Sequence, residues 1–365
     1  MEQLRVGIIG ATGMVGQRFI SLLENHPWFK ITCLAASSRS AGKTYREAVG
    51  GRWAFPWNIP ADAADLIVTE AGNIDQISNQ VDFFFCAVDM KKDEIRALEE
   101  NYACHEIPVV SNNSACRGLE DVPMVVPEIN AAHLEVIPTQ RKRLGTTHGF
   151  IAVKPNCSIQ SYVPALTPLM DFGPTEVSVC TYQAISGAGK TFATWPEMVD
   201  NVIPYIGGED EKSEQEPLKL WGRVADLGNG PVIVNADKPV ISAQCLRVAA
   251  SDGHMAAVSV RFEKKVTMEQ ILDRWTHYET EAQRLELPSA PKPFLQYFDD
   301  PSRPQTRLDR DFQGGFGVSI GRLREDRIFD WRFVCLSHNT IRGAAGGGIL
   351  TAELLTRKGF LTPRN

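Results

Sequence analysis

Cys157 is the residue in this sequence best suited to act as a nucleophile. It lies in Pro155-Asn156-Cys157-Ser158, where a loop is expected to enter a helix. The positive end of a helix dipole lowers the pKa of a nearby thiol and so raises the fraction of reactive thiolate. Asn156 could donate a hydrogen bond to an oxyanion that develops beside the thiol. Because an isolated cysteine is more often a small buried side chain, this hypothesis requires an acid–base partner.

His254 is the candidate for that partner. It follows Asp252-Gly253, which between two alternating strands is a strong signal for a β-hairpin. A two-residue turn would place His254 opposite Ser251 and on the same sheet face as Arg247. A solvent-exposed hairpin histidine is the alternative. Taken together, a thiol, an imidazole and an arginine beside a dinucleotide site favour thiohemiacetal chemistry with hydride transfer.

Three glycines near the N-terminus indicate that dinucleotide site. Gly10, Gly13 and Gly16 form a G-x-x-G-x-x-G cluster between an apolar run at 4–9 and helical spacing at 17–24. In this context glycine permits a tight turn and lets backbone N–H groups approach a pyrophosphate. The spacing departs by one residue from the commoner G-x-G-x-x-G, and a glycine turn without a ligand is the alternative.

The end of the next predicted strand distinguishes the two nicotinamide cofactors. An NAD site usually has an acid there that accepts hydrogen bonds from the ribose. This chain has Ser37-Ser38-Arg39-Ser40 and Lys43 instead. Hydroxyls and a guanidinium suit a 2′-phosphate, which favours NADP over NAD; a solvated basic turn is the alternative.

A second glycine segment resembles a P-loop but does not fit one. The end of the motif G-x-x-x-x-G-K-[ST] matches Ser186-Gly187-Ala188-Gly189-Lys190-Thr191. The first glycine of the motif would fall at position 184, however, and that residue is Ala184. The segment also does not follow the first strand of a sheet. We therefore expect a flexible loop whose glycine backbone packs against a ligand, and not a kinase or ATPase site.

The elements that must position these residues fall into two groups. In the first group strands alternate with helices, which predicts a doubly wound, Rossmann-like parallel sheet. Its strands are expected at 4–9, 30–36, 66–69, 81–88 and 109–111, with a helix at 91–104. The second group opens with a helix at 158–170 that Pro164 and Pro168 must kink or shorten. Longer alternating strands follow at 175–184, 241–250, 255–262 and 316–324.

We therefore predict an α/β chain with two domains. The dinucleotide-binding domain comprises residues 1–155 and the C-terminal helix within 340–365, and an α+β catalytic and dimerisation domain comprises 156–339. The acidic run at 209–216 is expected to be mostly a solvated face, with Glu209 and Lys212 one helical turn apart and facing the same way.

Composition limits the classes of protein. Acidic residues outnumber basic ones by 44 to 38, which argues against a nucleic-acid binder. No apolar stretch is long enough to span a membrane. The eight cysteines are scattered without a CxxC pair, and the histidines form no HxxxH pair. We expect a cytoplasmic protein with reduced cysteines and no structural metal.

The motifs together resemble the aspartate-semialdehyde dehydrogenase family over essentially the whole chain, and its archaeal and fungal branch more than the enterobacterial one. The segments that carry the resemblance are 10–16, 111–117, 155–158, Gln183, 208–212, Arg247 with His254, and Asn339 ahead of 342–346. The resemblance implies reduction of aspartyl phosphate by NADPH to the semialdehyde, on the route to lysine, threonine and methionine. It also implies inorganic phosphate as a partner and a homodimer or homotetramer.

The resemblance further implies a role for each matching residue. Cys157 would form an acyl-thioester, His254 would be the acid–base, Gln183 would orient the substrate, and Asn156 would assist. Arg117 and Lys212 would bind phosphate, Arg247 the α-carboxylate and Glu209 the amino group. The NADP site would comprise Gly10, Thr12, Gly13, Met14, Val15, Ser37, Arg39, Ser40, Ser186, Gly187 and Asn339. A malonyl-CoA reductase of the same fold and a catalytically silent NADP-binding regulator are the alternatives.

Overall fold

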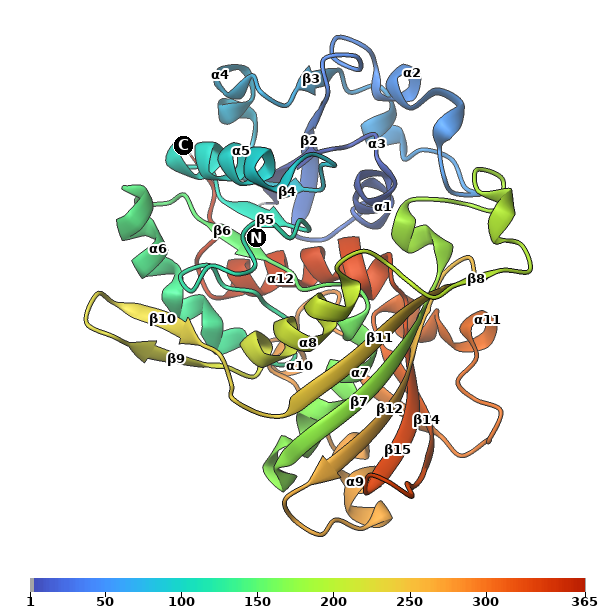
Figure 1. The fold of residues 1–365 in the computed structure, drawn as a ribbon. Helices are drawn as coiled ribbons and strands as arrows, with labels where there is room; N and C mark the ends of the chain where they lie inside the picture. Colours follow the sequence, from blue (N-terminus) through green and yellow to red (C-terminus); the bar gives the residue numbers. More distant parts are fainter. Residues whose placement is uncertain (1–2, 365) are drawn as a thin grey trace.

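The structure, a computed structural model, describes residues 3–364 and contains two large sheets (Figure 1). The first sheet has six parallel strands in the order β3-β2-β1-β4-β5-β6. Their bounds are β1 (Leu4–Ile9), β2 (Phe29–Ala36), β3 (Val68–Glu70), β4 (Phe83–Cys86), β5 (Val109–Ser111) and β6 (Ile151–Val153). This order is that of a doubly wound dinucleotide-binding sheet, with its crevice between β1 and β4, and it confirms the predicted fold class.

Helices cover this sheet on both faces, which explains why its strands are continuously apolar. All four residues of β4 are buried. The last helix of the chain, α12, returns to this sheet and contacts β5 and α1 (Figure 1). Ile349 and Leu354 of α12 belong to one hydrophobic cluster with Val6 and Phe85 of the sheet.

The second sheet is mixed and has seven strands in the order β13-β14-β15-β12-β7-β11-β8. Their bounds are β7 (Pro174–Gln183), β8 (Val202–Ile203), β11 (Val240–Val248), β12 (His254–Phe262), β13 (Leu295–Phe298), β14 (Val318–Glu325) and β15 (Trp331–Ser337). A separate two-stranded hairpin is formed by β9 (Arg223–Asp226) and β10 (Pro231–Val234).

The twelve α-helices differ widely in length. They are α1 (Met14–Leu22), α2 (Tyr45–Val49), α3 (Ala61–Ala64), α4 (Ile74–Ile77), α5 (Lys92–Cys104), α6 (Ile137–Leu144), α7 (Ile159–Leu166), α8 (Glu209–Leu220), α9 (Met268–Thr276), α10 (Glu281–Arg284), α11 (Thr306–Asp309) and α12 (Gly346–Arg357). As the prolines predicted, the helix expected at 158–170 is cut short: α7 ends at Leu166 and a 3₁₀ segment continues to Phe172. Within residues 3–364, no helix combines the length and apolarity needed to cross a membrane.

The hairpin expected at Asp252-Gly253 is wrong. Strands β11 and β12 do not pair with each other, because β7 lies between them, parallel to β11 and antiparallel to β12. His254 is paired with Ser337 of β15 and not with Ser251. The connection between β11 and β12 therefore crosses over the end of β7, and the three strand ends meet at one place.

Candidate active site

Three of the predicted site residues meet at this crossing. Arg247 on β11 is the register partner of Gln183 at the end of β7, and on the other side of β7 Met255 pairs with Tyr182. Gln183, Arg247 and His254 are all buried and share one face of the sheet. The predicted common face of His254 and Arg247 is thus present, although an intervening strand and not a hairpin creates it.

Gly187 seals this cluster from one side. A Cβ atom there would lie 2.8 Å from an Arg247 nitrogen and 3.0 Å from Nε2 of His254. The glycine backbone thus packs on the two side chains, and a larger residue would displace them. The loop that resembles a P-loop therefore serves to cover this cluster.

His254 is held as a neutral hydrogen-bond donor. Its Nδ1 accepts a hydrogen bond from the backbone N–H of Ala184 at 3.0 Å, so the proton of the neutral ring lies on Nε2. Burial, and next the charge of Arg247, lower the pKa of His254 to about 3. Among residues 3–364, Nε2 is buried without a hydrogen-bond partner. The ring is therefore prepared to donate a proton to a ligand.

Cys157 lies two residues before α7, at the predicted loop-to-helix junction. The lowered pKa expected from the helix dipole is wrong. Burial, and next the Glu209 carboxylate, raise the pKa of the thiol. The nearby cations Lys154, Arg117 and Arg247 offset part of that increase. Desolvation of the thiolate outweighs the helix end here, so the thiol needs additional positive charge before it can react.

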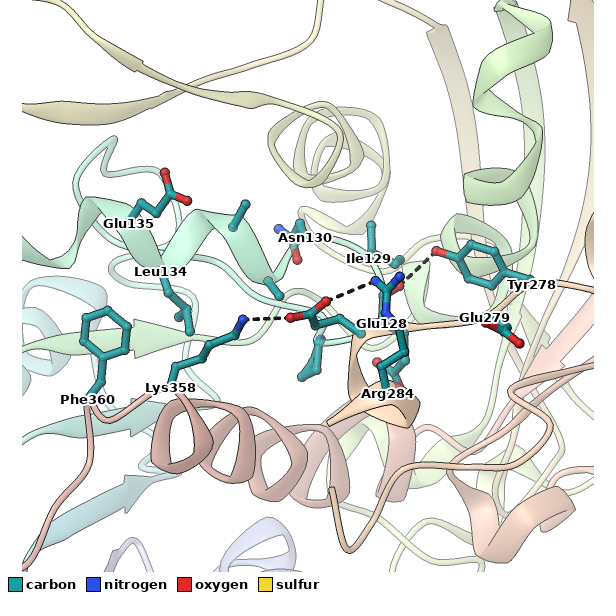
Figure 2. A pocket seen from close by; sticks show the side chains of 14 residues that line it. Glu128, Ile129, Asn130, Leu134, Glu135, Tyr278, Glu279, Arg284, Lys358 and Phe360 are labelled. Atoms are coloured by element: carbon teal, nitrogen blue, oxygen red, sulfur yellow. Dashed lines mark hydrogen bonds and ion pairs between the residues drawn. The ribbon is translucent and has the colours of Figure 1, made fainter. Parts of the chain in front are cut away.

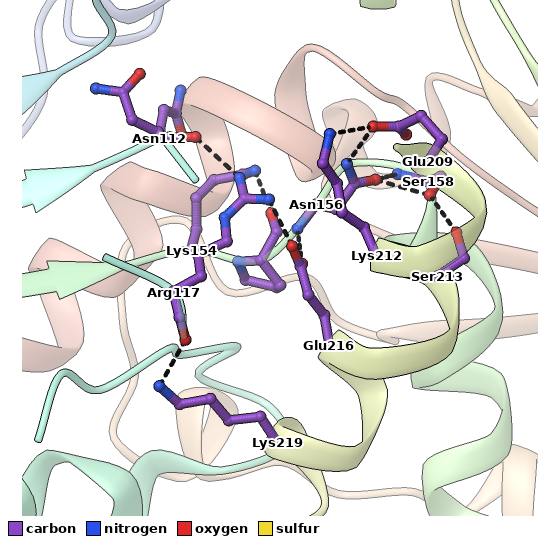
Figure 3. Close-up of polar contacts among 12 residues, drawn as sticks. Asn112, Arg117, Lys154, Asn156, Ser158, Glu209, Lys212, Ser213, Glu216 and Lys219 are labelled. Atoms are coloured by element: carbon purple, nitrogen blue, oxygen red, sulfur yellow. Dashed lines mark hydrogen bonds and ion pairs between the residues drawn. The ribbon is translucent and has the colours of Figure 1, made fainter. Parts of the chain in front are cut away.

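Glu209, the first residue of α8, contacts Asn156 of the thiol loop (Figure 3) and also connects that loop with the end of β7. Its carboxylate accepts hydrogen bonds from the side chains of Asn156 at 2.9 Å and Gln183 at 3.2 Å. It also forms an ion pair of 2.8 Å with Lys212. Glu209 and Lys212 therefore face the same way on one helix, as predicted, and they are in addition paired with each other.

Asn156 shapes the thiol loop through both the oxygen and the nitrogen of its side-chain amide. Its side-chain oxygen accepts hydrogen bonds of 2.7 Å from both the backbone N–H and the hydroxyl of Ser158. Because one of its two amide N–H groups is donated to Glu209, one is left for a ligand. Asn156 thus fixes the loop, and it can also contribute the single donor that an oxyanion would need.

The description of 209–216 as mostly a solvated face is wrong for its inner positions. Glu209, Ser213 and Glu216 recur at helical spacing and are all buried. Glu216 forms an ion pair of 2.8 Å with Arg117 and accepts the backbone N–H of Asn156. The i, i+4, i+7 spacing was the sequence signal for this face, but the high charge of the run concealed it.

The residues predicted for phosphate face a hollow of about 480 Å³. It is lined by Arg117, Lys212 and Glu216, and by the exposed Lys92 at the start of α5. A second cavity of about 440 Å³ contains none of the predicted site residues (Figure 2). Its cations Arg284 and Lys358 are both paired with Glu281.

The predicted cofactor residues of the first sheet lie around the start of α1. Gly10 has a φ of +85°, and a Cβ atom there would lie 2.3 Å from the carbonyl oxygen of Ala87. A Cβ on Gly16 would lie 2.3 Å from the carbonyl oxygen of Gly10, so strand and helix pack without space for a side chain. Within the described part of the chain, residues 3–364, no side chain caps α1. Its first N–H groups, next to Thr12, Gly13, Met14 and Val15, are therefore available to a pyrophosphate.

The residues expected at the 2′-phosphate form a turn after β2. The N–H of Ser40 donates to the carbonyl of Ser37 at 2.9 Å, and Arg39 at the tip is exposed. The remaining predicted cofactor residues lie on the second domain. Asn339 donates to the Ser186 hydroxyl and accepts the Gly253 N–H, each at 2.8 Å, and so joins the Gly187 loop to the His254 strand.

Comparisons with known proteins agree with this geometry. A family model described as "Semialdehyde dehydrogenase, NAD binding domain" matches residues 5–137, and one described as "Semialdehyde dehydrogenase, dimerisation domain" matches 166–342. An aspartate-semialdehyde dehydrogenase from Archaeoglobus fulgidus is 43% identical over 353 residues, covering 97% of this chain and 98% of that protein. One from Schizosaccharomyces pombe is 42% identical over 362 residues, covering 98% and 99%.

A solved structure gives the same result. The aspartate-semialdehyde dehydrogenase of Candida albicans, crystallised with NADP, superposes with a TM-score of 0.87 at 39% identity, covering 98% of this chain and 100% of that one. The chain belongs to the aspartate-semialdehyde dehydrogenase family. The relatives named here are archaeal and fungal, which confirms the predicted branch.

Cys157 lies between the two regions that the semialdehyde dehydrogenase models match, and Glu209, Arg247 and His254 lie in the dimerisation domain. Sequence reasoning missed two charged residues of this site, Glu216 and Lys154. No local pattern distinguishes Lys154 from a surface lysine, and only its burial in the folded chain reveals it.

Proposed function

We propose that this chain is an NADP-dependent aspartate-semialdehyde dehydrogenase, which converts L-aspartyl 4-phosphate to L-aspartate 4-semialdehyde in lysine, threonine and methionine biosynthesis. The observation that carries the proposal is the arrangement around Glu209. One carboxylate joins the loop of Cys157, a partly exposed cysteine, to Gln183, and Arg247 and His254 lie beside them. Membership of the family supports the same conclusion.

The residues divide the chemistry among them. The sulfur of Cys157 attacks the acyl carbon of aspartyl phosphate and forms the carbon–sulfur bond. The bond from that carbon to the phosphate oxygen breaks, and the departing phosphate takes up the thiol proton and leaves a thioester. Bound at the proposed NADP site, NADPH would supply the hydride for reduction of this thioester. The Nε2–H of His254 donates to the substrate oxygen as negative charge develops there, and the thiolate of Cys157 then leaves with release of the aldehyde.

The NADP site is proposed on the uncapped start of α1 and the turn after β2. The first N–H groups of α1 suit the pyrophosphate, and Gly10 and Gly16 allow it to approach closely. Ser37, Arg39 and Ser40 form a turn without an acid, which suits a 2′-phosphate.

Replacing Arg39 by alanine should raise KM for NADP and leave KM for NAD almost unchanged. Loss of a charge-assisted contact costs about 1.5–3 kcal/mol, which corresponds to roughly 10- to 150-fold. Arg46→Ala removes another exposed arginine nearby and should change neither value. Equal effects of Arg39→Ala on the two cofactors would show that Arg39 does not contact the 2′-phosphate.

The substrate is decided by Glu209 with Arg247. An α-amino acid has an ammonium and a carboxylate on one carbon. Its site therefore needs a carboxylate side chain close to a cationic side chain. Malonyl-CoA has no amino group for Glu209 to bind, and the buried Glu209 carboxylate would repel the carboxylate of malonyl-CoA. The wild type should therefore reduce NADP with aspartate semialdehyde and inorganic phosphate, and should turn over malonyl-CoA with NADPH far more slowly.

Glu209→Gln should lower kcat/KM for the semialdehyde by roughly 10- to 100-fold, because the side chain keeps its shape and loses its charge. Glu211→Gln, on the exposed side of the same helix, is the matched control. A wild type that prefers malonyl-CoA, or unchanged semialdehyde kinetics in Glu209→Gln, would contradict the assigned substrate.

The wider setting is also proposed. We assign the enzyme to the cytoplasm, and to a homodimer or a homotetramer built on the second sheet. One face of that sheet is packed against α7 and α8, while Ser178 and Tyr182 of β7 and Ser242 of β11 are exposed on the other. We also propose a domain division at residue 155, with residues 340–365 returning to the first domain. The packing of α12 in one hydrophobic cluster with the first sheet supports that return.

A further inference from the structure

Lys154 is a buried lysine with almost no hydrogen-bond partners. It is 3% exposed and lies on the same loop as Cys157. Its ammonium group donates to the carbonyl oxygen of Pro155, the next residue in the chain. An ammonium has three N–H groups, and across residues 3–364 no carboxylate lies within ion-pair distance of this one. Two donors and a full charge are therefore left for something else.

The other cations of the site differ in this respect. Arg117 is paired with Glu216 at 2.8 Å, and Lys212 with Glu209 at 2.8 Å. Arg247 donates to the carbonyl of Ala184 at 2.7 Å and, like Lys154, has no carboxylate partner among the described residues. The two residues that were assigned to phosphate from the sequence are thus already neutralised within the protein. The two unneutralised cations are Lys154 and Arg247.

Lys154 and Arg117 extend toward the same space (Figure 3). Arg117 binds the carbonyl oxygen of Asn112 at 3.0 Å through one nitrogen and Glu216 through the other, so its position is fixed. Two cations held side by side in a buried place repel each other, and an anion between them removes that repulsion.

We propose that Lys154 is a substrate-binding residue that, together with Arg117, holds the phosphoryl group of aspartyl phosphate and the inorganic phosphate of the reverse reaction. This inference rests on the proposed function. It assigns the two unneutralised cations to the two anionic ends of one substrate: Arg247 to the α-carboxylate and Lys154 to the phosphoryl group.

The balance of charge supports this assignment. The site contains four cations, Arg117, Lys154, Lys212 and Arg247, and two carboxylates, Glu209 and Glu216, so the cations exceed the carboxylates by two. Aspartyl phosphate carries a doubly charged phosphoryl group, a carboxylate and an ammonium, and so has an excess of two negative charges. Without Lys154 the site would have an excess of only one positive charge, against the two excess negative charges of the substrate.

The ionisation of Lys154 should make phosphate binding depend on pH. Burial, and next the charge of Arg117, lower the pKa of Lys154 to about 7, against the smaller opposing effects of Cys157, Glu216 and Glu209. Below that pH the side chain is charged and binds phosphate, and above it the charge is lost. KM for phosphate in the wild type should therefore rise with pH above about 7.

The test is Lys154→Met, which keeps the length of the side chain and removes its charge. In the direction of semialdehyde oxidation, KM for inorganic phosphate should rise on the order of 10- to 100-fold, the range expected for a lost charge-assisted contact. KM for NADP and for the semialdehyde should change by less than about threefold. Lys154→Arg should restore most of the phosphate affinity, and its KM for phosphate should rise less between pH 7 and 9, because arginine stays charged. Comparing the two enzymes cancels the titration of phosphate itself.

Lys142→Met, which removes an exposed lysine of α6, is the control for a general loss of positive charge and should leave KM for phosphate within about threefold. Thermal melting shows whether each variant is folded. If Lys154→Met is folded and lowers kcat without changing KM for phosphate, Lys154 acts on the Cys157 thiol and does not bind phosphate. That result overturns the proposal. If Lys154→Met does not fold, the comparison rests on Lys154→Arg. The proposal is overturned if KM for phosphate depends on pH in Lys154→Arg just as it does in the wild type. A wild type inactive with semialdehyde, phosphate and NADP would instead contradict the proposed function.

Discussion

Replacing Cys157 by alanine should abolish turnover, with a loss of roughly 10⁴-fold or more, because no other group can form the thioester. Binding of NADP should survive, since Gly10, Gly16 and Arg39 lie in the segments that follow β1 and β2 and none depends on the thiol. NADP reduction with semialdehyde and phosphate measures the first effect, and quenching of protein fluorescence by NADP measures the second.

The matched control is Cys104→Ala, which removes an exposed thiol at the end of α5, far along the chain from the site, and should retain full activity. Trapping of the acyl-enzyme should attach the substrate's acyl group to Cys157 in the wild type and to no cysteine in Cys157→Ala. Substantial activity of Cys157→Ala would exclude a thioester mechanism.

The first sheet could be predicted from the sequence because its signals are local. The apolar run of β1, the glycine cluster and α1 follow one another directly, and each was recognised to within a few residues. The helix expected at 17–24 is in fact Met14–Leu22, since the turn after Gly10 leads straight into the helix. The strand expected at 81–88 is shortened to Phe83–Cys86, the part that neighbouring strands pair.

The second sheet shows where local signals fail. Asp252-Gly253 is a valid turn sequence, but a turn signal does not say whether another strand separates the two that it connects. Here β7, about 70 residues earlier in the chain, is inserted between them. Strand β15, which forms the other side of β12, was also missed, although it pairs with His254 through Ser337.

The family resemblance predicted which residues form the candidate site. The sequence could not predict the electrostatics of those residues. The sequence places Cys157 before a helix, but the burial and the neighbouring Glu209 that raise the pKa of the thiol come from the tertiary structure. For the same reason Glu216 could not be separated from a solvated acidic run, nor Lys154 from a surface lysine. Charge in a sequence shows composition, and only the fold shows which charges are paired.

Replacing His254 by alanine should lower kcat by roughly 10²–10⁴-fold, the usual contribution of a well-placed acid–base group. The hydrogen bond from Ala184 occupies Nδ1, so the neutral ring can offer the substrate only the proton on Nε2. The first role of His254 is therefore donation to the substrate oxygen, and the variant should still form the thioester while its reduction becomes slow. His277→Ala, which removes an exposed histidine, is the control.

The pH dependence distinguishes a neutral donor from a histidine with an ordinary pKa. Because burial and Arg247 lower the pKa of His254 to about 3, the ring stays neutral as the pH falls through 6.5. Saturating phosphate keeps Lys154 charged. Under this condition, kcat/KM for the semialdehyde should not fall at acidic pH because of His254, so the acid sides of the wild-type and His254→Ala pH profiles should have the same shape. A limb near pH 6.5 in the wild type that disappears in His254→Ala would mean that the imidazole must lose a proton to act. In that case the ring would be a base with an accessible Nε2 lone pair, and the donor role derived from the Ala184 hydrogen bond would be wrong.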